Sequence, residues 1–150
     1  MTEEEGRAAV VTEAMTWLRT PYHHRAKLKG VGVDCAQFVL AVYANAGLIV
    51  DFDTGEYPHD WHLHRSVERY MTQVLRFARE IPVGAARPGD VLLFRFGRAF
   101  SHGAIVTSYP QIVHAVLQAG AVVLGDLDRD ADLVGRETRC FSFWAARHGG

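Results

Sequence analysis

Cys35, His102 and His114 are the residues whose types and order can carry a reaction. A thiol is mostly protonated at neutral pH, so a cysteine that attacks a carbonyl carbon needs a base beside it. The base in turn needs a polar group that holds its ring in place. The sequence therefore predicts a cysteine hydrolase in which Cys35 is the nucleophile, His102 the base and His114 the orienting group. The alternative for Cys35 is a small buried residue on the apolar face of a helix.

The chain around the cysteine predicts a helix that begins there. Apolar residues recur from Cys35 to Ala46 at the spacing of one helical face, and Gly47 follows as a C-cap. Asp34 is the expected N-cap, which places the thiol at the positive end of the helix, where a thiolate is favoured. A further role of Asp34 in binding a substrate amine is the less economical interpretation.

The two histidines lie in segments whose apolar residues alternate with a period of two. Residues 102–108 and 112–117 are predicted strands joined by a hairpin at 109–111, so both histidines can share one face. If the helix of the cysteine packs on that face, the three side chains line up. The Tyr22 hydroxyl, with backbone N–H groups of the helix, can bind an oxyanion, and a packed loop tyrosine is the alternative. Ser101 is expected to shape the backbone beside the base.

The remaining elements complete an α+β pattern in which helices precede an antiparallel sheet, within one catalytic domain over residues 1–150. A first helix is expected from its N-cap Thr2 to the stop at Thr20–Pro21. A third helix is expected from about Trp61 to Phe77, capped by Asp60. Further strands are predicted over residues 91–96, 121–124 and 138–144.

The composition argues against several classes of protein. A formal charge of -1 with 22% charged residues gives no electrostatic bias towards nucleic acid or an anionic membrane. The first residues contain neither a secretory signal nor a run long enough for membrane insertion, so we expect synthesis in the cytoplasm. Two cysteines are too few for a disulfide framework, and both are expected to be thiols.

We expect neither a metal nor a cofactor. The other paired or clustered histidines are His23–His24 and His59, His62 and His64. Their spacing is poor for zinc, which needs four ligands in a tetrahedral arrangement. The segment from Asp126 to Glu137 approaches a calcium loop, but Ala131 stands where that loop requires glycine. A solvated acidic turn is therefore the preferred interpretation.

Five motifs, taken in order, resemble the NlpC/P60 family of cell-wall peptidases. They are Thr20–Tyr22, Asp34–Cys35, Arg87–Phe94, Ser101–Val106 and Ile112–Ala115. The resemblance implies a papain-like fold, with N-terminal helices packed on a central antiparallel sheet. It also implies cleavage of γ-D-glutamyl to diamino-acid bonds in peptidoglycan stem peptides. Cys35, His102 and His114 match the triad of the family, and Tyr22 matches a tyrosine that lines its active site.

The sequence departs from the family pattern at two places. Ala36–Gln37 follows the cysteine where many members have Ser-Gly, so the contacts around the nucleophile are expected to differ. The insert with Tyr57–His64 resembles the phage and prophage branch, whose proteins are found with tail genes. This implies delivery to the cell wall in a phage-like or gene-transfer particle, with tail-tip proteins as partners. Trp61 in this insert is a candidate for substrate binding or control.

Two other functions are compatible with the same residues. An N-acyl amidase or an acyltransferase would use the same cysteine and histidines on a different bond. A non-catalytic structural protein of a tail tip would keep the fold without turnover. The role of the histidines in the insert is left open by the sequence.

Overall fold

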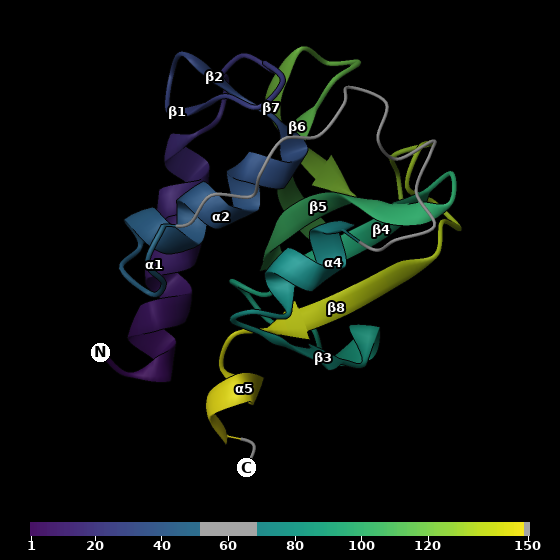
Figure 1. Cartoon of the computed structure of the whole chain (residues 1–150). Helices are drawn as coiled ribbons and strands as arrows, with labels where there is room; N and C mark the ends of the chain where they lie inside the picture. Colours follow the sequence, from purple (N-terminus) through teal and green to yellow (C-terminus); the bar gives the residue numbers. More distant parts are fainter. Residues whose placement is uncertain (52–68, 149–150) are drawn as a thin grey trace.

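The structure is a computed structural model, and it describes residues 1–51 and 69–148. Within these residues, six strands form an antiparallel sheet in the order β3-β8-β4-β5-β6-β7, and β1 and β2 form a separate pair. Helices α1, α2 and α4 pack on one face of the larger sheet (Figure 1). No helix in the described part of the chain is both long and apolar enough to cross a membrane.

The helices and strands have the following bounds. The helical elements are α1 (Glu3–Thr16), α2 (Cys35–Asn45), α4 (Arg69–Val74), the 3-10 turn η1 (Val83–Ala85) and α5 (Ala145–His148). The strands are β1 (Lys27–Leu28), β2 (Gly32–Val33), β3 (Arg79–Ile81), β4 (Val91–Phe96), β5 (Ala99–Ser108), β6 (Gln111–Val116), β7 (Ala121–Asp126) and β8 (Thr138–Ser142).

The first two helices begin at the caps that the sequence predicts. Thr2 and Glu5 form a capping box at α1, and Asp34 accepts a hydrogen bond of 2.9 Å from the backbone N–H of Gln37 at α2. Caps of this kind stabilise a helix by about 1 kcal/mol. α1 ends at Thr16, earlier than the predicted stop at Thr20–Pro21, because the chain leaves the helix through turns at 17–20.

The third predicted helix is only partly described. Its expected cap Asp60 and its start at Trp61 lie outside the described residues, and α4 covers Arg69–Val74. The expected end at Phe77 is wrong, because the backbone N–H of Phe77 bonds Val74 in a turn and the chain then enters β3. β3 has three residues, which is too short for a visible alternation of apolar and polar side chains.

The core consists of two clusters on opposite faces of the sheet. On the helical side, Phe38 and Tyr43 of α2 pack with Ile105 and Val113 of the sheet. On the other side, apolar residues of β4, β5, β6 and β8 pack under the chain after β7, represented by Leu133. Strand alternation thus sends successive side chains into different clusters, which fixes the register of the sheet.

A buried ion pair joins α1 to the turn before β4. Arg7 Nη1 donates to Asp90 Oδ1 and to the carbonyl oxygen of Pro88, each at 2.9 Å. The other carboxylate oxygen of Asp90 accepts from the backbone N–H of Arg87. Burial raises the pKa of Asp90, and the hydrogen bond from the backbone of Arg87 and the cation of Arg7 oppose this shift by stabilising the carboxylate.

Candidate active site

The catalytic candidates meet where two neighbouring strands diverge. β5 and β6 pair near the turn that joins them, as far as Ile105 opposite Val113. Beyond this point β5 continues alongside β4, and β6 continues alongside β7. His102 and His114 lie on the diverging parts. A side chain from another element can therefore reach His102 and His114 through the opening between the two strands.

α2 brings the nucleophile to this opening. The Cys35 thiol donates to the carbonyl oxygen of Ser101, with 3.5 Å between Sγ and the oxygen. Because Asp34 caps the helix, Cys35 is the first helical residue, and the cap fixes its position. The thiol is half-buried and lines the same cavity as both histidines.

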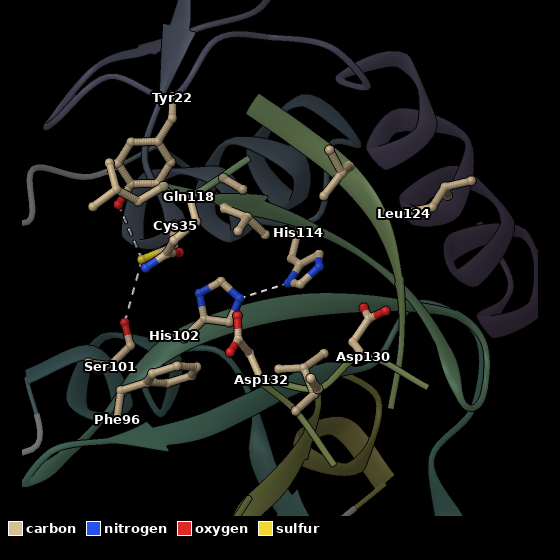
Figure 2. Close-up of a pocket in the computed structure, with 16 residues that line it drawn as sticks. Tyr22, Cys35, Phe96, Ser101, His102, His114, Gln118, Leu124, Asp130 and Asp132 are labelled. Carbon is tan, nitrogen blue, oxygen red and sulfur yellow. Dashed lines mark hydrogen bonds between the residues drawn. The ribbon is translucent and has the colours of Figure 1, made fainter. Parts of the chain in front are cut away.

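The two imidazole rings form one hydrogen-bonded unit. Nε2 of His102 lies 2.8 Å from Nδ1 of His114, and the ring of His102 lies between Cys35 and His114 in Figure 2. Nδ1 of His102 is thus the ring nitrogen left to face the thiol. Phe94 and Phe96 pack against His102 with ring centroids 5.8 and 5.5 Å away, so the base has little freedom to rotate.

The expected packing of the helix needs correction. The histidines share a face, as predicted, but it is the face of Phe94 and Ile112, away from α2. α2 packs on the opposite face, against Ile105 and Val113. The thiol still reaches the histidines because the first residue of α2 lies at the opening between the strands. Alternation along a strand shows which residues share a face, but not which face a helix covers.

The charges of the site differ from the sequence expectation. Burial, with the nearby charge of Asp34, raises the pKa of the Cys35 thiol to about 12. Burial lowers the pKa of His102 well below 6.5, with smaller effects of His114 and Arg136, and lowers the pKa of His114 to about 4. Desolvation therefore opposes the thiolate that the helix N-terminus favours, and these shifts favour a neutral thiol beside neutral rings.

Tyr22 lies at the thiol. Its hydroxyl donates towards Cys35 Sγ over 3.8 Å, and burial raises the pKa of the hydroxyl, which therefore stays protonated. Isolated bridges at Pro21 and Tyr22 hold this loop against Ala121 and Val33. The position suits a donor to an oxyanion formed next to the sulfur, and that role stays a prediction.

Asp34 is enclosed by backbone donors. Beside the cap bond, its Oδ2 accepts from the backbone N–H of Arg25 at 2.7 Å, and the residue is 2% exposed. Arg25 has a φ of 63°, a conformation that costs energy outside glycine, and this bond helps to hold it. The geometry gives Asp34 a structural role, and the alternative of amine binding gains no support from it.

Ser101 shapes the strand beside the base. In the pairing of β5 with β4, His102 lies opposite Phe94 and Phe100 opposite Arg95, so Ser101 is the extra residue of a bulge. The bulge turns its carbonyl oxygen to the thiol. The remaining candidate, Trp61, lies outside the described residues, as do the histidines at 59, 62 and 64.

Tyr70 lies near Cys35 and is absent from the site that the sequence predicts. Its hydroxyl donates to the carbonyl oxygen of Cys35 at 2.5 Å, from α4. Gly103 makes room for it, since a Cβ at this position would overlap the hydroxyl. The helical spacing of Tyr70 predicts an inward side chain, but no local signal shows that its oxygen reaches the nucleophile.

The cavity around these residues has a volume of about 450 Å³, which is in the range of small-ligand sites. Cys35 and Tyr22 line one side, and Asp130 lies on the far side, beyond His114 (Figure 2). Asp132 also lines the cavity. The β6–β7 turn adds Gln118 to the rim. Among the described residues, no group of three His, Cys, Asp or Glu side chains is arranged to hold a metal ion.

The fold of this chain is similar to that of solved NlpC/P60 proteins. The NlpC/p60 domain of peptidoglycan hydrolase SagA is 23% identical with a TM-score of 0.62, over 89% of this chain and 96% of that one. RipB, a peptidoglycan hydrolase from Mycobacterium tuberculosis, is 19% identical with a TM-score of 0.60, over 93% of this chain and 65% of that one. RipD from the same organism, described as a non-catalytic NlpC/p60 domain protein adapted to peptidoglycan binding, is 15% identical with a TM-score of 0.59. It matches over 91% of this chain and 96% of its own.

These likenesses show the papain-like α+β fold. No curated protein matches the chain. The model of the NlpC/P60 family matches residues 19–131, a region that includes the cysteine, both histidines and Tyr22. With most of its length matched, the chain belongs to the NlpC/P60 family.

Proposed function

We propose that the protein is a cysteine peptidase that cleaves peptide bonds in peptidoglycan stem peptides, at the γ-D-glutamyl to diamino-acid link. The observation that carries the proposal is the joint placement of Cys35, His102 and His114 in one cavity, with the imidazoles 2.8 Å apart. Family membership supports the substrate class, as do SagA and RipB, both named as peptidoglycan hydrolases.

The mechanism follows from the neutral resting state. Nδ1 of His102 takes the thiol proton as Sγ attacks the carbonyl carbon, and the charge moves to the carbonyl oxygen. The Tyr22 hydroxyl and the backbone N–H groups of Cys35 and Ala36, which already favour negative charge at the sulfur, can stabilise it.

Breakdown of the tetrahedral intermediate completes the first half of the reaction. His102 returns its proton to the leaving amine, the C–N bond breaks, and a thioester remains on Cys35. Water then attacks the thioester with His102 as base, releasing the carboxylic acid and the thiol. His114 keeps the ring of His102 in place through both halves.

The bond can be identified by mass spectrometry of muropeptides incubated with the protein and, in parallel, with Cys35→Ala. We expect cysteine-dependent fragments divided between the second and third stem residues. Release of the whole stem would instead indicate an amidase at the sugar–peptide junction. Transfer of the acyl group to an added amine would indicate an acyltransferase. Either result would replace the proposed bond while keeping the same three residues.

A second candidate function is peptidoglycan binding without turnover. RipD, a structural neighbour, is described in this way, and the resting thiol of Cys35 is protonated and bonded to Ser101. Incubation with insoluble peptidoglycan separates the two candidates. Binding of the protein to the peptidoglycan with no new muropeptide fragments would favour the binding protein.

We also propose that the protein acts within a phage-like particle, with tail-tip proteins as partners. The support is the resemblance of the insert around residues 57–64, which lies outside the described residues. Mass spectrometry of particles purified from the producing cells should detect the chain together with tail proteins. Its absence from such particles, when it is present in the cells, would contradict this location.

A further inference from the structure

Asp130 lies behind the histidine pair, on the side away from the thiol. Nε2 of His114 and Oδ2 of Asp130 lie 2.6 and 3.0 Å from the point that a Cβ on Gly125 would occupy. Both atoms therefore lie close to Gly125, and a side chain at position 125 would displace them. Figure 2 shows Asp130 on the far side of the cavity from Cys35.

The turn after β7 fixes this carboxylate. Oδ2 of Asp130 accepts from the backbone N–H of Asp126 at 3.0 Å, and the backbone N–H of Asp130 donates to the carbonyl oxygen of Asp126 at 2.9 Å. The carbonyl oxygen of Asp130 also accepts from the backbone N–H of Leu133, a buried residue of the second core cluster. The acidic turn that the sequence showed is thus a rigid support beside the site.

In the described part of the chain, two titratable side chains act directly on His114. His102 faces it from β5, and Asp130 faces it from the turn after β7. Arg136 acts on His102 rather than on His114. Burial lowers the pKa of His114 to about 4, although the charge of Asp130 opposes this shift. His114 is therefore a neutral ring at neutral pH, with one proton that can sit on either nitrogen.

We propose that Asp130 is a positioning residue that holds His114 in the tautomer protonated at Nε2. The negative charge of Asp130 favours an N–H, with its partial positive charge, at Nε2, the ring nitrogen that lies with the carboxylate over Gly125. Nδ1 of His114 is then an acceptor and must receive its hydrogen bond from the Nε2–H of His102. This leaves Nδ1 of His102 without a proton, as a base that accepts one from Cys35 requires.

The inference rests on the proposed function for its meaning, but its test does not use peptidoglycan. The tautomer of His114 can be observed by 15N NMR of the protein labelled at histidine, because protonated and unprotonated ring nitrogens have distinct shifts. In the unmodified protein we expect Nε2 of His114 to be protonated. A proton on Nδ1 of His114 would overturn the inference without any variant.

The variant Asp130→Asn keeps an acceptor for the turn and removes the charge. We expect a mixture of His114 tautomers, a further fall in the pKa of His114 and slower alkylation of Cys35 by iodoacetamide, on the order of 10-fold. Asp128→Asn is the matched control, because Asp128 is exposed, belongs to the same turn and does not line the cavity. It should change neither the tautomer nor the alkylation rate.

The outcomes separate this inference from the proposed function. If Asp130→Asn leaves the tautomer and the alkylation rate unchanged, or if Asp128→Asn has the same effect, the inference is wrong. If the two readouts change as expected while the unmodified protein cleaves no muropeptide, the inference holds and the proposed peptidase activity fails.

Discussion

The three proposed catalytic residues, Cys35, His102 and His114, are expected to be uncharged at rest, which sets how the proposed reaction can begin. Burial raises the pKa of Cys35 and lowers those of both histidines, so a preformed thiolate–imidazolium pair is disfavoured. The proton must cross from sulfur to His102 as the substrate arrives. The oxyanion that forms as the sulfur attacks can then be stabilised beside Tyr22.

The pH dependence of the proposed cleavage follows from the proposed base. His102 can take a proton only when it is neutral, and burial lowers its pKa well below 6.5. We expect kcat/KM for a stem peptide to remain on its plateau at pH 6.5 and to fall only in more acidic buffer. Initial rates between pH 4 and 8 check this. A half-maximal rate at or above pH 6.5 would contradict the assigned burial of the base.

The stability of the fold should also depend on His114. Its pKa is about 4 in the folded protein and near 6.5 in the unfolded chain, so the unfolded state binds more protons between these values. The free energy of unfolding should therefore fall as the pH drops from 6.5 towards 4, with a contribution of His114 on the order of 3 kcal/mol. Urea unfolding of the protein and of His114→Gln at several pH values measures this. An equal fall in both would exclude the contribution.

At the scale of elements, the Arg7–Asp90 pair is the contact that anchors α1 to the sheet. Arg7→Leu leaves the Asp90 carboxylate buried without its cation, and we expect a loss of roughly 3 to 5 kcal/mol in the free energy of unfolding. Arg87→Ala is the matched control, since its ion pairs with Glu3 and Glu4 are exposed and should cost less than about 1 kcal/mol. Equal losses in urea unfolding would contradict the argument.

The contact of α4 with β5 can be tested through one glycine. Gly103→Ala places a Cβ against the Tyr70 hydroxyl, so we expect a loss of roughly 1 to 3 kcal/mol in stability and slower alkylation of Cys35. Adding Tyr70→Phe should recover part of the stability, because it removes the overlapping oxygen. Gly84→Ala is a control with open space around the new Cβ. If Tyr70→Phe lowers the stability of the Gly103→Ala variant as much as it lowers that of the unmodified protein, the overlap of Cβ with the hydroxyl is not the cause of the loss.

The sequence predicts those parts of the site that depend on local signals. The cap at Asp34 and the alternation around His102 are properties of a few consecutive residues, and the structure confirms both elements. The divergence of β5 from β6 and the face covered by α2 depend on long-range pairing, which periodicity does not contain. The composition of residues 126–130 predicts an acidic turn. The position of Asp130 behind His114 depends on how β7 packs beside β6, which the local sequence does not show.

On the scale of the whole molecule, the proposed nucleophile and its proposed base come from different layers. The helical layer supplies Cys35 from α2, and the sheet supplies His102 from β5 and His114 from β6. Figure 1 shows these three elements. The geometry of the site therefore depends on the packing of these layers, through contacts such as Tyr70 with Gly103. The same arrangement leaves the cavity open between the Tyr22 loop and the turn that carries Asp130.

The most direct test of the central claim is the initial rate of stem-peptide cleavage by the unmodified protein, by Cys35→Ala and by Cys140→Ala. Cys140 is buried in the second core cluster and is the other free cysteine of the chain. We expect cleavage by the unmodified protein, none above background with Cys35→Ala, and a retained rate with Cys140→Ala. Cleavage that survives the loss of Cys35 would contradict the assignment of the nucleophile, and with it the proposed mechanism.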